Sequence, residues 1–205
     1  MAGFIQIISY STSRIDEVLA AGRKVDAALG SGSSSGPTRV IVTANRDTPN
    51  RYATIVEFES YESAMEQSNR PETGEFAAQM ASLCDGPPTF YNLDVIESEK
   101  PSPGASGFLQ AIIYSTTRFD EVQAAGHAHR DRMAGSDGPA PTRVVITRNR
   151  DEANGYVTLI GFASYEDAMA NSNRPETGEF AQVMMSLCDG PPAFRNLDVL
   201  ENYQP

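Results

Sequence analysis

Hydrophobic and polar positions along the first half of the chain alternate between the period of strands and the period of helices. Four short segments rich in β-branched and aromatic residues predict strands at residues 4–10, 38–45, 52–58 and 90–96. Between them, apolar residues recur at helical spacing from Ile15 to Leu29, and a second helical stretch from Ser60 to Leu83 is interrupted at Arg70-Pro71. The predicted order is therefore β-α-β-β-α-β.

The same pattern occurs a second time at a constant offset of 104 residues. Residues 68–77 read SNRPETGEFA and recur unchanged as residues 172–181. A duplicated unit of about 100 residues has the usual size of a small domain. Residues 98–106 have the Pro, Gly and Ser content of a linker. We therefore predict two repeats, 1–97 and 107–205, joined by a linker short enough for the repeats to pack together.

The βαββαβ order defines the fold class. It is typical of the split βαβ, ferredoxin-like arrangement, in which both helices cover one face of an antiparallel sheet. Both alternating sets of side chains along residues 4–10 and 52–58 contain large hydrophobic residues, so the second face of the sheet must also be buried. We predict an α+β fold of two ferredoxin-like repeats packed sheet to sheet, as an intramolecular dimeric α/β barrel.

Three segments carry a resemblance to a known family: FESYESA at residues 58–64, SNRPETG at residues 68–74 and DGPPTF at residues 85–90, each with its equivalent in the second repeat. With them the chain resembles the dimeric α/β barrel superfamily, which includes the antibiotic biosynthesis monooxygenases, and in particular small actinobacterial proteins of unknown function. The superfamily contains cofactor-free monooxygenases, heme enzymes, isomerases and cyclases. Its fold therefore does not select one activity.

Composition narrows the choice of partners and cofactors. The 205 residues include 16 Lys and Arg against 27 Asp and Glu, and this acidic balance opposes binding to nucleic acid or to anionic membranes. No apolar run approaches the ~20 residues of a membrane span, and no leader pattern is present at the start, so we expect a cytoplasmic location. With only two His and two Cys in the chain, we expect no metal site built from several His and Cys ligands. Cys84 and Cys188 are expected to be small buried thiols.

Differences between the repeats indicate where the second repeat has acquired a role of its own. On the apolar face of the first helix, Gln123 replaces Leu19 and His129 replaces Val25. An unsatisfied buried donor costs about 1–3 kcal/mol, so these side chains need partners, which a pocket with water or ligand would supply. Smaller side chains stand at two further positions of the second repeat: Ala111 for Ile7, and Gly161 for Glu57.

A second interpretation of these exchanges stays open. His129 is equally compatible with a hydrogen-bonded core histidine, and the other exchanges with neutral drift. His127 lies on another face of the same helix and is expected to be exposed. Heme enzymes of the superfamily use a proximal histidine; the first repeat contains no histidine, and His129 is the residue of the second repeat that could take this role, so heme stays an alternative. We nevertheless predict that the protein uses neither a metal nor an organic cofactor.

Cofactor-free oxygenation requires a base that converts the substrate to a carbanion or phenolate. We assign His129 as the base or orienting group and Tyr114 as a second catalytic residue. The expected ligand is a small, aromatic or polyketide-like molecule, and the expected activity is a monooxygenase. A cofactor-free isomerase or cyclase and a non-catalytic binding or stress-associated protein are the alternatives, and further homo-oligomerisation stays open. The candidate substrate contacts are Gln123, Asn149, Arg148 and Tyr156.

Overall fold

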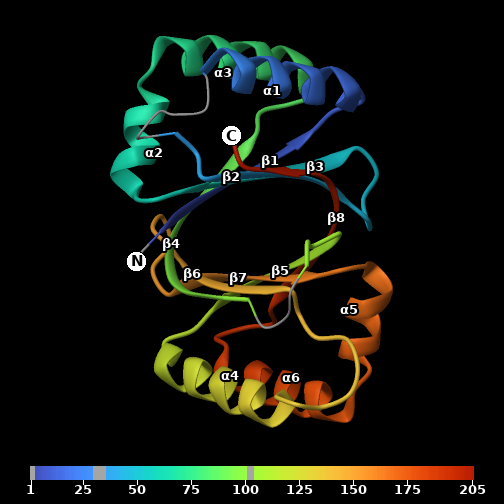
Figure 1. Ribbon diagram of the computed structural model, residues 1–205. Coiled ribbons are helices and arrows are strands. Elements are labelled where there is room, and N and C mark those ends of the chain that lie inside the picture. The colour runs from blue at the N-terminus through green and yellow to red at the C-terminus, as the bar shows by residue number, and fades with distance from the viewer. Residues whose placement is uncertain (1–2, 30–35, 101–103) are drawn as a thin grey trace. The chain divides into compact units, whose positions relative to one another are not determined.

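The computed structural model describes residues 3–29, 36–100 and 104–205 (Figure 1). The first repeat contains β1 (Phe4–Ser11), α1 (Ile15–Leu29), β2 (Arg39–Asn45), β3 (Arg51–Phe58), α2 (Tyr61–Ser68), α3 (Pro71–Leu83) and β4 (Thr89–Glu99). The second contains β5 (Phe108–Ser115), α4 (Phe119–Met133), β6 (Arg143–Asn149), β7 (Gly155–Phe162), α5 (Tyr165–Ser172), α6 (Pro175–Leu187) and β8 (Ala193–Tyr203). The predicted order of elements is confirmed in both repeats.

The strands follow one another in the order β1-β3-β2-β8-β5-β7-β6-β4 and close into a barrel. The predicted fold class, two ferredoxin-like βαββαβ repeats in an α/β barrel, is thereby confirmed. Contacts divide the chain into two units, Met1–Val95 with Val199–Pro205, and Ile96–Asp198. Each unit thus contains the end of the last strand of the other repeat, because β4 and β8 run past the boundaries between the units.

In each unit two long helices lie side by side over one face of the sheet, α1 with α3 and α4 with α6 (Figure 1). Apolar side chains from both helices and from the sheet fill the space beneath them. No helix in the described part of the chain is both long and apolar enough to cross a membrane. The buried residues between the helices and the sheet are Tyr10, Val18, Ala21 and Leu83 in the first unit, and Tyr114, Val122, Tyr156 and Leu187 in the second.

Local chemistry explains where the helices and turns begin. The Ser60 side chain accepts a hydrogen bond from the backbone N–H of Ser63 and caps α2, and Pro71 occupies the first turn of α3, where no N–H is needed. The hairpin between β2 and β3 turns at Asn50, whose φ is 59°, and its equivalent turns at Asn154, whose φ is 61°. Asn tolerates this left-handed conformation better than most residues.

The start of the second repeat depends on a glycine. A Cβ added at Gly107 would lie 2.4 Å from the carbonyl oxygen of Ala163, whereas at the equivalent Gly3 it would lie 3.4 Å from that of Phe58. We expect Gly107→Ala to lower the free energy of unfolding by about 1–3 kcal/mol, the usual cost of overpacking, and Gly3→Ala to lower it less. Chemical denaturation measures both. Equal effects of the two variants would contradict the close contact at Gly107.

Candidate functional site

A row of aromatic side chains crosses the second unit on the face that α4 covers. Tyr156 on β7 is the cross-strand partner of both Tyr114 on β5 and Arg148 on β6, so the three side chains share one face of the sheet. The Tyr114 and Tyr156 ring centroids are 5.6 Å apart, and Phe119 of α4 stacks on Tyr156 at 4.3 Å. The exposed Arg148 places Cζ 5.8 Å from the centre of the Tyr156 ring. An aromatic layer therefore ends in a guanidinium group at the surface.

Tyr114 is a hydrogen-bond donor at neutral pH. Its side chain is buried, and its hydroxyl lies 3.5 Å from Thr158 Oγ1. Burial raises the pKa of Tyr114 to about 12, and the hydrogen bond with Thr158 offsets only part of this effect. The hydroxyl therefore keeps its proton at neutral pH and does not act as a base there.

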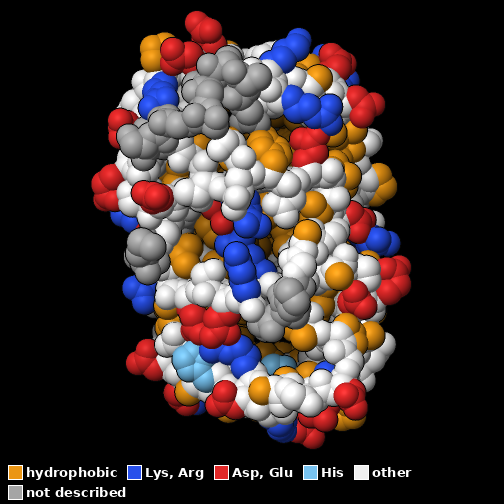
Figure 2. All heavy atoms as spheres, in the orientation of Figure 1, with side chains coloured by type: hydrophobic (Ala, Val, Ile, Leu, Met, Phe, Trp, Pro, Cys, Tyr) orange, Lys and Arg blue, Asp and Glu red, His pale blue; other side chains and the backbone are white. Residues whose placement is uncertain are grey.

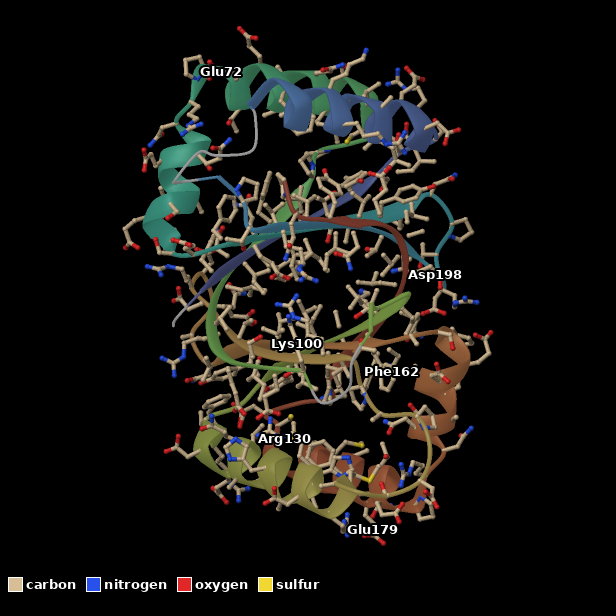
Figure 3. All side chains as sticks on the ribbon, in the orientation of Figure 1. Glu72, Lys100, Arg130, Phe162, Glu179 and Asp198 are labelled. Atoms are coloured by element: carbon tan, nitrogen blue, oxygen red, sulfur yellow. The ribbon has the colours of Figure 1, made fainter. Side chains whose placement is uncertain are left out.

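A polar network joins α4 to the end of β4. Glu97 Oε2 accepts hydrogen bonds from Gln123 Nε2 at 3.3 Å and from His127 Nε2 at 3.0 Å. Arg130 bridges two carboxylates, with its Nη2 2.7 Å from Glu97 Oε1 and its Nη1 2.9 Å from Glu99 Oε2. Figure 3 shows Arg130 extending from the side of α4 that faces the sheet. Glu97 is thus the centre of the network.

Hydrogen bonding sets the charges of the two glutamates. Desolvation by itself would raise the pKa of Glu97, but the hydrogen bonds with His127, Gln123, Arg130 and Glu99 together lower it to about 2. The pKa of Glu99 is raised by burial and by its hydrogen bond with Glu97, although Arg130 opposes this. Glu97 is therefore ionised throughout the physiological range, and Glu99 is the carboxyl group that takes up a proton more readily.

The aromatic row and the polar network lie along one stripe of α4. Phe119, Gln123 and His127 are four residues apart, which places their side chains on one face of the helix. Phe119 contacts β7, and Gln123 and His127 contact β4, which is separated from β7 by β6 in the strand order. Figure 2 shows acidic, basic and histidine side chains next to one another on the surface over α4. The structure thus brings Tyr114, Tyr156 and Arg148 together on one face of the sheet, whereas Gln123 belongs to the Glu97 network.

His127 has the arrangement of a proton acceptor. Its side chain is 48% exposed, as expected from the sequence, while that of its partner Glu97 is 20% exposed. Because the ionised Glu97 accepts from Nε2, the neutral imidazole carries its hydrogen there and leaves Nδ1 as the basic nitrogen. A carboxylate that accepts from one ring nitrogen fixes the orientation and the tautomer of the ring.

His129 lies elsewhere on α4. Its ring stacks on Phe180 of α6, with centroids 4.5 Å apart and planes 5° apart, and its buried Nδ1 has no hydrogen-bond partner among the described residues. The pKa of His129 is lowered by burial and by the positive charges of Arg132 and Arg174, against a smaller opposite effect of Glu176. The structure therefore places His129 between the two helices, apart from Gln123.

The remaining sequence candidates have structural contacts. Asn149 Oδ1 accepts from the backbone N–H of Asp151 at 3.1 Å, and Asn45 Oδ1 accepts from Asp47 at 2.9 Å in the equivalent turn. Ala111 and Gly161 lie an odd number of residues from Tyr114 and Tyr156 along their strands, so they belong to the other face of the sheet. At Gly161 the vacated space is taken up by Ser106, whose Oγ lies 2.3 Å from the position of an added Cβ. These two exchanges do not enlarge the space beneath α4.

Metal and thiol chemistry have little support in the described residues. No group of three or more His, Cys, Asp or Glu side chains in residues 3–29, 36–100 and 104–205 has the arrangement of a metal site. Cys84 and Cys188 are free and half-buried, and burial raises the pKa of both thiols, with a smaller contribution from the neighbouring Asp85 and Asp189. The thiols are therefore mostly protonated at neutral pH, which disfavours a nucleophilic role.

The sequence analysis did not assign four members of the network: Glu97, Glu99, His127 and Arg130. A signal for them was present in the comparison of the repeats, since Arg130 replaces Asp26 and His127 replaces Arg23. Together with Gln123, which replaces Leu19, these positions form a polar stripe at helical spacing whose residues all differ from those of the first repeat. Their partners could not be found in this way, because residues 98–106 were assigned to a linker while β4 continues to Glu99.

The three bonds to Glu97 have a measurable effect on stability. We expect Glu97→Gln to lower the free energy of unfolding at neutral pH by about 1–2 kcal/mol, after allowance for solvent screening. The pKa of Glu97 is depressed to about 2 in the folded chain, so its ionised form contributes stability above the unfolded value of about 4.3. This contribution is lost as the pH falls toward 2. Denaturant titrations of both chains between about pH 2 and about pH 7 measure it.

Two further measurements distinguish the loss of the Glu97 network from a general loss of stability. Glu201 is the equivalent residue of the first repeat and pairs with Arg23, whose side chain is 65% exposed, so Glu201→Gln should cost less. A difference between wild type and Glu97→Gln that stays the same at about pH 2 and about pH 7 would contradict the assigned network.

Solved structures share this fold at low sequence identity, whereas no protein-family model and no curated protein matches the chain. A candidate monooxygenase from Fusobacterium nucleatum subsp. nucleatum superposes with a TM-score of 0.75 at 11% identity, over 99% of this chain and 94% of its own. An anthrone oxidase-like protein superposes with a TM-score of 0.68 at 12% identity, over 98% of this chain and 93% of its own. A ferredoxin-fold protein from Listeria monocytogenes, related to antibiotic biosynthesis monooxygenases, superposes with a TM-score of 0.58 at 11% identity. The match covers 98% of this chain and 96% of that protein. The chain therefore has the dimeric α/β barrel fold of antibiotic biosynthesis monooxygenase-like proteins, with both repeats in one polypeptide.

Proposed function

We propose that the second repeat binds a small aromatic or polyketide-like molecule and oxidises it with molecular oxygen, without a metal or an organic cofactor. The observation that carries this proposal is the His127–Glu97 pair, in which an ionised carboxylate orients a histidine on the helix whose first turn stacks on the aromatic layer. Cofactor-free oxygenation needs such a proton acceptor, because only the substrate anion transfers an electron to oxygen readily. The fold shared with an anthrone oxidase-like protein supports the choice of an anthrone-like substrate.

The proposed reaction converts an activated methylene group to a carbonyl group. His127 Nδ1 takes a proton from the substrate C–H, and the resulting carbanion passes one electron to O₂. The two radicals combine to a C–O bond, and the hydroperoxide takes up a proton and eliminates water. The balance is R₂CH₂ + O₂ giving R₂C=O + H₂O, so molecular oxygen is the only co-reactant.

The other groups of the layer stabilise the substrate anion. The Arg148 guanidinium offers donors and positive charge to the oxygen of an enolate or phenolate, and Tyr114 and Gln123 offer neutral donors. The partly exposed Phe119, which stacks on the buried Tyr156, provides the apolar surface against which an aromatic ring packs. Asn149 fixes the turn that follows Arg148.

His129 is the alternative base. Its buried Nδ1 lacks a partner and is compatible with an acceptor role, but the charges of Arg132 and Arg174 oppose the protonated form that proton abstraction would create. We therefore propose His127, and not His129, as the base.

Oxygen consumption tests the proposal. Purified protein mixed with 1,8-dihydroxy-9-anthrone is expected to consume one O₂ per anthraquinone formed, faster than the uncatalysed reaction, and to do so after treatment with a chelator. An isomerase or cyclase with the same base would exchange the C–H proton with deuterated water without consuming oxygen. Neither oxygen uptake nor exchange above the rate with heat-denatured protein, over a set of anthrones and naphthols, would leave a non-catalytic binding protein.

A further inference from the structure

The first unit contains a shallow cavity, wide open to solvent, at the position equivalent to the polar network of the second. The cavity has a volume of about 450 Å³ and is lined by Arg23, Glu201, Asn202 and Tyr203. Small-molecule sites in proteins have volumes of roughly 300–1,000 Å³. The space is therefore large enough for a molecule with one or two aromatic rings.

The two repeats differ at this position in a way that changes its chemistry. Arg23 and Tyr203 stand where the second repeat has His127 and Glu99, while Glu201 corresponds to Glu97. In the second unit Arg130 ties both glutamates together, whereas the tyrosine of the first cannot make such an ion pair. A guanidinium group does not accept a proton at neutral pH, so Arg23 cannot replace His127 as a base. The first repeat thus has the space without the proton acceptor.

The walls of the cavity offer a donor from Arg23 and an acceptor from Glu201. Arg23 donates through Nε, at 2.8 Å, and through Nη2 to a single oxygen of Glu201, Oε1. Among the side chains that the structure describes, which do not include those of residues 26–29, Nη1 of Arg23 and Oε2 of Glu201 have no hydrogen-bond partner. The Glu201 side chain is only 17% exposed, so an additional hydrogen bond to it forms in a partly desolvated place.

We propose that this cavity binds a small aromatic molecule with two neighbouring hydroxyl groups and does not convert it. One hydroxyl donates to Glu201 Oε2, the oxygen of the other accepts from Arg23 Nη1, and Tyr203 flanks the ring. We choose two hydroxyl groups on one rigid ring system because the donor and the acceptor belong to two side chains that hold each other in place. The proposal goes beyond the oxidation assigned to the second repeat and does not depend on it, because it concerns binding in the first.

The test uses 2,3-dihydroxynaphthalene, whose fluorescence reports binding to a chain without Trp. We expect saturable binding to the full-length chain, and at least tenfold weaker binding of 2,3-dimethoxynaphthalene, which cannot donate. Glu201→Gln and Arg23→Leu are expected to weaken binding of the diol by about 10-fold to 100-fold, the usual effect of losing a hydrogen bond to a charged group. Arg23→Lys should retain more of the affinity than Arg23→Leu.

The duplication supplies the matched control. Glu97→Gln makes the same exchange in the second repeat and should leave the affinity for the diol within twofold of wild type. Thermal melting verifies that each variant is folded. The proposal is overturned if the diol does not bind, if Glu201→Gln leaves its affinity unchanged, or if Glu97→Gln weakens binding as much as Glu201→Gln. Oxidation of the anthrone is measured separately, by oxygen uptake. A failure of the proposed function would therefore appear in that assay and not in the binding of the diol.

Discussion

Replacing His127 with glutamine is expected to slow oxidation of the anthrone substrate by about 10²–10⁴-fold, the range that general-base catalysis contributes. Glutamine has a similar length and can donate to Glu97, but its amide does not accept a proton. The effect should therefore appear in kcat, while KM changes by less than about threefold because the aromatic layer of Phe119 and Tyr156 is retained. Oxygen uptake measured over a range of substrate concentrations separates the two constants.

Two variants decide which residue is the base. Arg23→Gln makes the corresponding change in the first repeat and should leave the rate of oxidation unchanged, because Arg23 has no role in proton transfer. His129→Gln tests the alternative base. If His129→Gln abolishes oxidation while His127→Gln has no effect, the base is His129 and the role assigned to the His127–Glu97 pair is wrong.

The fold could be predicted from the sequence because its determinants are local and occur twice. Alternating hydrophobic residues define each strand, Pro71 and Ser60 mark helix starts that the structure retains, and the constant offset shows that the same order of elements occurs twice. A prediction supported by two copies of one pattern is more secure than one supported by a single segment. Only the length of the last strand of each repeat was underestimated, because Glu97, Ser98 and Glu99 have the composition of a loop.

The candidate site was only partly predictable, for a physical reason. Helical spacing shows which residues share a face, but not which strand that face meets. His127 was expected to be exposed, and it is, yet its exposed ring also bonds to a carboxylate thirty residues away in the sequence. The pairing arises because β4 lies next to β6 and ends under α4, which is a property of the strand order. Tyr114, Tyr156 and Arg148 were each named as candidates from the sequence, but only the pairing of β7 with β5 and β6 shows that they are neighbours.

Truncating Phe108 to alanine is expected to lower the free energy of unfolding by about 3–5 kcal/mol. Phe108 has an exposed fraction of 0%, packs with Phe162 and Ala168, and makes an edge-to-face contact with Tyr165 at 5.3 Å. Its loss leaves a cavity among rigid neighbours. Phe4 occupies the equivalent place with an exposed fraction of 1% and an edge-to-face contact with Tyr61 at 5.3 Å, so Phe4→Ala should cost a similar amount.

The shape of the unfolding transition is more informative than the loss in free energy, because each unit contains the end of the last strand of the other repeat. If Phe108→Ala loosens the second unit, β8 loses the residues that hold its first part, and its end in the first unit, Val199–Pro205, loses its anchor. We therefore expect one cooperative transition in wild type and in both variants, moved to lower denaturant concentration by either substitution. Circular dichroism follows the helices of both units together. Two separate transitions in Phe108→Ala, one of them at the wild-type midpoint, would show that the repeats unfold independently despite the exchanged strand ends.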